Sequence, residues 1–110
     1  METLCIRLTS GEEIIGKIDQ EETTIDTTTT SIMPKGVVTL GTVRGITFQQ
    51  VGQNQLGIAF IPFAIANSDA KMTFILENCA AVVYPPSADL ERGYLEQTSG
   101  ISLARPGIQL

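Results

Sequence analysis

The chain has 110 residues, a formal net charge of −5, 43% apolar residues and a mean hydropathy of +0.17. This length predicts one domain, and the apolar fraction with its modest net charge argues against disorder. The chain contains no histidine, which excludes the commonest general base and the commonest transition-metal ligand. Its acidic balance also argues against a protein whose whole surface binds phosphate.

The N-terminal residues predict a cytoplasmic protein without a signal peptide, because Glu2 stands where such a peptide carries positive charge. The longest apolar-rich run, residues 56–66, is interrupted by Pro62 and is shorter than the roughly 20 residues of a membrane helix. Cys5 and Cys79 are too few for a disulfide scaffold or a complete zinc site. We expect both to be small buried hydrophobic residues, and we expect no cofactor, metal or membrane contact.

An alternation of period two dominates the beginning of the chain. Leu4, Ile6 and Leu8 fall on one face, as they would on a half-buried strand. A turn follows at 10–12, where glycine accepts positive φ, and the alternation then resumes. Residues 3–19 therefore predict a β-hairpin.

The next segment is rich in threonine and isoleucine over residues 23–33. These side chains are stiff at χ1 and favour a solvated strand, with a loop as the alternative. A proline and a glycine within 34–36 end this segment. A short strand is then predicted over 37–40, ending at Gly41.

A second hairpin is predicted from strands at 46–51 and 56–63 around a four-residue loop. Residues 57–63 do not alternate and are apolar on both faces, and residues 79–84 share this property. A single-layer antiparallel sheet normally leaves one face to water. Burial of these two strands by a partner subunit is one explanation, and the core of a closed barrel is the other.

A helix is predicted over about residues 87–98. The strand before it ends at two prolines, Ser87 is a suitable N-cap, and Leu90 and Tyr94 share one face. We expect residues 1–98 to form a single, mainly β domain and residues 99–110 to be a flexible tail.

Catalytic constellations are not evident in the sequence. Adjacent residues on a strand point to opposite faces, so the pairs Glu12–Glu13 and Glu21–Glu22 do not predict paired catalytic carboxylates. The glycines at 41, 45, 52 and 57 lie between short strands rather than before a helix, unlike a nucleotide-binding loop. Ser–Lys catalysis has no positive support, and we predict that the protein is not an enzyme.

Two segments resemble the motifs of the Sm family. Residues 6–18 are similar to the first Sm motif and residues 56–61 to the start of the second. Over about residues 4–98 the chain resembles the Sm-like (Lsm/Hfq-type) proteins of marine viruses, including cyanophages. The resemblance implies an all-β fold, a small, strongly bent, five-stranded SH3-like barrel, here with a short C-terminal α-helix where Sm proteins usually begin with one. A phage-encoded protein of this kind would act in the cytoplasm of its host.

The resemblance also implies assembly. Sm protomers form rings by pairing the fourth strand of one subunit with the fifth strand of the next, so we expect a homo-oligomeric ring of about five to seven subunits. The residues expected at this subunit interface are Ile58, Phe60, Ile61, Ala80, Val82 and Tyr84.

Single-stranded RNA is the ligand that the resemblance implies, but the uridine-binding residues of the family are missing. Asp26 stands in place of the asparagine, and Pro62–Phe63 stands in place of the arginine and glycine. RNA would therefore contact another surface, and the residues expected there are Asn67, Lys71, Arg44 and Lys35. Lys35, Arg44 and Lys71 belong to a weakly basic stretch, 27–71. Scattered, solvated charges are the simpler interpretation of this stretch, and a local positive surface is the other. The alternative function is a ring that binds protein partners and no nucleic acid.

Overall fold

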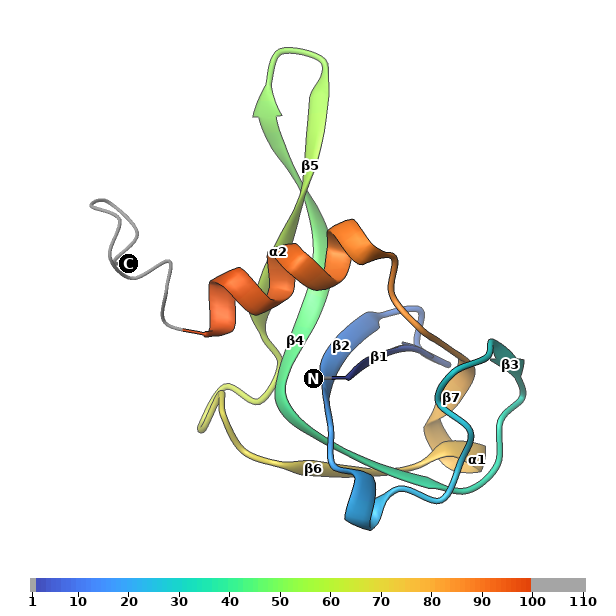
Figure 1. The fold of residues 1–110 in the computed structure, drawn as a ribbon. Helices are drawn as coiled ribbons and strands as arrows, with labels where there is room; N and C mark the ends of the chain where they lie inside the picture. Colours follow the sequence, from blue (N-terminus) through green and yellow to red (C-terminus); the bar gives the residue numbers. More distant parts are fainter. Residues whose placement is uncertain (1, 100–110) are drawn as a thin grey trace.

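The computed structural model describes residues 2–99 as a seven-stranded antiparallel sheet with a helix at its C-terminal end (Figure 1). The chain is thus mainly β with a short C-terminal helix, as predicted. No helix in this range is long and apolar enough to cross a membrane. In chain order the elements are β1 (Thr3–Leu8), β2 (Glu13–Ile18), the 3-10 helix η1 (Gln20–Glu22), β3 (Ser31–Ile32), β4 (Val37–Gly52), β5 (Gln55–Pro62), β6 (Met72–Ile75), α1 (Leu76–Cys79), β7 (Ala80–Tyr84) and α2 (Ala88–Thr98).

The sheet is open. Its strands follow the order β3-β7-β1-β2-β4-β5, and β6 pairs with the beginning of β4. The expectation of a closed five-stranded barrel is therefore wrong, because the sheet has more strands and its path does not close. The predicted first hairpin is confirmed as β1 and β2, which pair in register from Thr3 opposite Lys17 to Arg7 opposite Glu13.

The strand that begins at Val37 was expected to end at Gly41, but β4 continues to Gly52. Figure 1 shows β4 as one long strand. Lys17 of β2 pairs with Gly41, so the ladder continues across the glycine. Between the pair Lys17–Gly41 and the pair Ile15–Arg44, one residue of β2, Gly16, lies opposite two residues of β4, Thr42 and Val43. This is a β-bulge, which bends a strand. The part of β4 before the bulge pairs with β6 and the part after it pairs with β5.

Two apolar clusters lie on opposite faces of the sheet. Leu4, Ile6 and Leu8 face the larger cluster, as their alternation predicted, together with Val38 and Leu40 of β4. Cys5 of β1 faces the opposite side of the sheet. There it forms the second cluster with Ile15, Tyr94 and their partly buried neighbours. Helix α2 therefore covers the second face of the sheet, which is why Thr3 and Cys5 of β1 are buried on that side as well.

The predicted C-terminal helix is confirmed. The Ser87 side chain accepts a hydrogen bond from the Leu90 backbone N–H at 3.2 Å, which caps the first turn. Tyr94 is fully buried, and its hydroxyl donates to the Thr42 carbonyl oxygen at 2.6 Å. Thr42 has a φ of 52°, an uncommon conformation for threonine. The helix thus holds the bulge of β4 in place.

The threonine-rich segment forms less regular structure than expected. Only Ser31 and Ile32 are a strand, and residues 24–30 are irregular, so the solvated strand over 23–33 is largely wrong. Threonine side chains bond locally instead, as when the Asp26 carboxylate accepts from the backbone N–H and the hydroxyl of Thr28. The expected tail, 99–110, lies outside the described residues apart from Ser99.

Two smaller expectations are corrected. The second hairpin turns through two residues, Gln53 and Asn54, rather than four, and Asn54 has a positive φ of 60°. Cys5 is fully buried, and burial raises the pKa of its thiol to about 12. Cys79 is only half-buried in α1, where its thiol donates to the Ile75 carbonyl oxygen.

Candidate functional site: an uncharged hairpin and two apolar grooves

The outer halves of β4 and β5 form a twisted hairpin that projects from the body of the molecule (Figure 1). The chain has no charged residue from 45 to 68, a range that includes this whole projection. Native proteins usually protect a long edge strand with charges, prolines or a covering element. The outer edge of β5 has no strand partner within residues 2–99 and lacks charges. It is therefore available for pairing with another chain.

One face of the hairpin is apolar. Directly paired residues share a face, and the pairs here are Ile46 with Phe60 and Phe48 with Ile58. Helix α2 covers the inner pair: Ile46 and Phe60 pack against the Tyr94 cluster, and the Phe60 and Tyr94 rings meet edge to face at 5.9 Å. The outer residues are left open, since Phe48 is 72% exposed and Ile58 is 48% exposed.

A groove of about 390 Å³ separates this apolar face from α2. The helix runs close to β5 at Gly93, where a Cβ would make an ordinary contact with the Phe60 ring at 3.6 Å. The groove is lined by Ile58, Phe60, Ser87, Asp89, Leu90 and Gly93.

A second apolar groove lies at the other end of the sheet, beside β7, and has a volume of about 510 Å³. It is lined by Thr9, Ile32, Met33, Pro34, Lys35, Glu77, Ala80, Ala81 and Val82. The chain therefore presents two separate apolar surfaces, one at each end of the strand order.

The residues predicted at a subunit interface divide between these two surfaces. Ile58, Phe60 and Ile61 belong to β5, and Ile61 is half exposed. Ala80, Val82 and Tyr84 belong to β7, which lies next to the terminal strand β3 at the other end of the strand order. Their role as an interface stays a prediction.

The three β7 residues are less accessible than those of β5. Ala80 is buried, and Val82 pairs with Ile32 of β3. The Tyr84 hydroxyl donates to the Glu13 carboxylate, and burial, followed by this hydrogen bond, raises the pKa of Tyr84.

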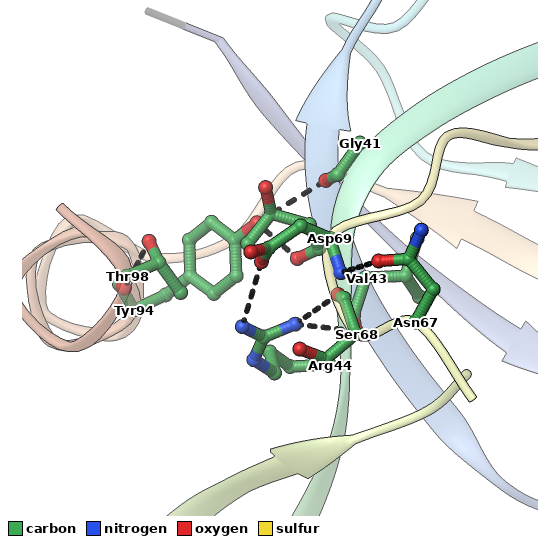
Figure 2. Close-up of polar contacts among 9 residues, drawn as sticks. Gly41, Val43, Arg44, Asn67, Ser68, Asp69, Tyr94 and Thr98 are labelled. Carbon is green, nitrogen blue, oxygen red and sulfur yellow. Dashed lines mark hydrogen bonds and ion pairs between the residues drawn. The ribbon is translucent and has the colours of Figure 1, made fainter. Parts of the chain in front are cut away.

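The residues predicted to bind nucleic acid do not form one free basic surface. Figure 2 shows the Arg44 guanidinium turned into the loop after β5. It donates to the Ser68 carbonyl oxygen at 2.6 Å and to the Asp69 carboxylate at 3.3 Å. The side chain is only 13% exposed. Asn67 lies in the same loop, where its side-chain oxygen accepts from the Asp69 backbone N–H.

Lys71 and Lys35 lie beside carboxylates. The Lys71 ammonium forms an ion pair with Asp19 at 2.9 Å, and this contact lowers the pKa of the Asp19 carboxyl. The pKa of Glu77 is lowered chiefly by the backbone N–H of Gly36, and the charge of Lys35 adds to this effect. Within the weakly basic stretch predicted over 27–71, Arg44 and Lys71 are therefore paired with carboxylates of the same chain.

Arg44→Ala is expected to destabilise the fold by about 1.5–3 kcal/mol, because it removes charge-assisted hydrogen bonds made by a nearly buried side chain. Chemical denaturation would measure the loss. Arg92→Ala is the matched control, since Arg92 pairs with Asp89 at an exposed site on α2 and its removal should change stability by less than about 0.5 kcal/mol. Equal losses in the two variants would contradict the structural role of Arg44.

The sequence analysis missed the most exposed apolar residues of the hairpin. Phe48, Val51 and Leu56 are all more than half exposed, but the expected interface began at Ile58. The absence of charge from 45 to 68 was the signal that could have identified them.

The comparisons with known proteins do not add a family: no protein-family model and no curated protein matches this chain. Within residues 2–99 there is no group of three or more acidic or cysteine side chains that could hold a metal ion. The features that define the chain are thus an open, mainly β fold and two unpartnered apolar surfaces.

Proposed function

We propose that this chain is a non-enzymatic, self-assembling protein. In this arrangement the β4–β5 hairpin of one copy packs against the β7 side of the next. The observation that carries the proposal is the projecting hairpin without charged residues, whose outer face exposes Phe48, Leu56 and Ile58. An apolar surface of this kind on a soluble domain usually marks a site of protein contact.

The positions of the two surfaces favour a ring. They lie at opposite ends of the strand order, so two copies joined hairpin to β7 would still expose one free surface of each kind. A heterologous contact of this type continues until the rotation closes a ring or extends into a filament. The resemblance to Sm-like proteins, whose rings join neighbouring edge strands, supports the closed form and an Sm-type variant of the fold.

Scaffolding of other proteins is the role that we favour for this assembly. Binding of single-stranded RNA remains a prediction of the resemblance, but it has less support, because Arg44 and Lys71 both pair with carboxylates of the same chain. Asp26, at the expected uridine position, has a lowered pKa because Thr28 donates to its carboxylate. It is therefore a negatively charged acceptor that repels phosphate.

Phe48→Lys tests the proposal. A lysine at the centre of an apolar contact loses its hydration without gaining a partner, so self-association should weaken by about 100-fold or more. Native mass spectrometry and light scattering over a range of concentrations would measure the change. Gln49→Lys introduces the same charge one residue away on the opposite hairpin face and should assemble like the wild type.

Three outcomes would count against the proposal. A wild-type chain that stays monomeric at high concentration would refute it, as would equal effects of the two lysine substitutions. Mass that is lost after nuclease treatment, together with assembly that weakens steeply as salt rises, would favour the nucleic-acid function instead. Apolar contacts should be nearly insensitive to salt.

A further inference from the structure

The outer edge of β7 is already occupied within the chain. Strand β3 pairs there, with Ser31 opposite Val83 and Ile32 opposite Val82, and the Met33 backbone N–H donates to the Ala81 carbonyl oxygen at 3.0 Å. The edge that a second copy would need is therefore covered by a strand of two residues.

This cover is loosely packed. Ile32 is 77% exposed and Met33 is 81% exposed, so β3 places little apolar surface against the body of the molecule. The second apolar groove remains open beside it, lined on one side by Ile32 and the three residues after it and on the other by β7 residues. Met33 also has a φ of 53°, a left-handed conformation that is unfavourable for a side chain of this size.

The loop that carries β3 is closed at its neck. The Thr24 backbone N–H donates to the Val37 carbonyl oxygen at 2.9 Å, and the Val37 N–H donates to the Thr24 hydroxyl at 3.1 Å. Gly36, with a φ of 107°, adjoins this neck on the β4 side. Ile25 packs against the larger core cluster and Pro34 is buried, so these two residues anchor the ends of the loop. Residues 26–33 between them can therefore leave β7 while the neck and β4 stay in place.

We propose that β3 is a displaceable guard strand that protects β7 in the single chain and gives way to β5 of a second copy during assembly. This inference rests on the proposed self-assembly. The exchange replaces a pairing of two residues with one that can extend along the five residues of β7, because β5 has eight residues and a free outer edge. It also releases Met33 from its left-handed conformation.

A disulfide between Ile32→Cys and Val82→Cys tests the exchange, since these residues lie directly opposite each other. Cys79→Ser removes the more accessible of the two native thiols. The oxidised variant should remain monomeric at concentrations at which the wild type assembles, and reduction should restore assembly. Assembly of the oxidised variant at the wild-type concentration would overturn the inference.

A pair of substitutions at Met33 gives an independent test that leaves β7 unchanged. Met33→Pro removes the N–H that donates to Ala81 and is incompatible with positive φ, so it should release β3 and lower the concentration needed for assembly by about tenfold. Met33→Asn keeps the donor and tolerates positive φ, so it should assemble like the wild type.

The outcomes separate the two proposals. If a folded Met33→Pro variant assembles no more readily than Met33→Asn, β3 does not guard the edge. If the wild type itself is monomeric throughout, the proposed self-assembly has failed, and the guard role fails with it. If the wild type assembles and neither the disulfide nor the proline changes the concentration at which it does so, only the guard role has failed.

Discussion

Tyr94→Ala is expected to destabilise the fold by about 3–5 kcal/mol, the range for truncating a large aromatic side chain in a core. Tyr94 is fully buried, contacts the Phe60 ring and donates to the Thr42 carbonyl oxygen. Its loss therefore removes both the packing that holds α2 to the sheet and the hydrogen bond at the β4 bulge. Chemical denaturation with circular dichroism would measure the loss, and Tm should fall by more than about 10 °C.

Tyr94→Phe is the matched variant, because it keeps the ring and removes only the hydroxyl. The expected loss is about 0.5–1.5 kcal/mol, the usual net contribution of one hydrogen bond. If Tyr94→Phe and Tyr94→Ala lower the stability of the fold equally, the ring does not provide most of the stabilisation. If neither substitution has an effect, α2 is not docked on the sheet as described.

Gly16→Ala should cost about 1–3 kcal/mol through overpacking. A Cβ at Gly16 would lie 2.7 Å from the Leu40 Cβ and 3.2 Å from the Gly41 carbonyl oxygen, and neither atom can move without shifting β4. The reason lies in the bulge, which brings β2 and β4 close together at this residue. The urea midpoint of unfolding would measure the change.

Gly41→Ala provides the control for this prediction. A Cβ at Gly41 would have Lys71 Cγ as its nearest neighbour, at 3.9 Å, which is an ordinary contact. The substitution should therefore be neutral or slightly stabilising, because alanine restricts the unfolded chain more than glycine does. A larger loss at Gly41 than at Gly16 would mean that the strands do not approach each other at the bulge in this way.

The two proposals give the hairpin and β3 opposite roles. The hairpin exposes apolar surface without charges, a pattern that promotes association, whereas β3 covers an edge, a pattern that opposes it. A chain with both features can stay monomeric when dilute and assemble when concentrated. This dependence of assembly on concentration requires only that the pairing of β3 with β7 be weak. The short length of β3, two residues, agrees with a weak pairing.

The candidate site illustrates why charge counts along a sequence do not locate a binding surface. Arg44, Lys71 and Lys35 outnumber the single acid in residues 27–71. In the fold, however, Lys71 pairs with Asp19, which lies outside that range, and Arg44 pairs with Asp69. Asp19 and Lys71 are 52 residues apart along the chain, so no local pattern indicated that they would meet.

The sequence alone determined those features that depend on neighbouring residues. The alternation of Leu4, Ile6 and Leu8 predicted the first strand, and Ser87 with the apolar pair at positions 90 and 94 predicted α2. Each depends on periodicity or on a cap a few residues away, which is the range over which backbone geometry repeats. The strand over 79–84, which is apolar on both faces, was also predicted and corresponds to β7. Its pairing with β3 was not predicted.

Only the tertiary structure decided the course of β4, the open sheet and the pairing of β3 with β7. Gly41 ends a strand by local preference, but pairing with β2 carries β4 through it, and long-range hydrogen bonds outweigh the preference of one residue. The partners of β7 and the exposure of Phe48 depend on contacts between residues far apart in sequence. Which apolar faces the fold covers is settled only by packing, and the faces left uncovered are the ones that carry the proposed function.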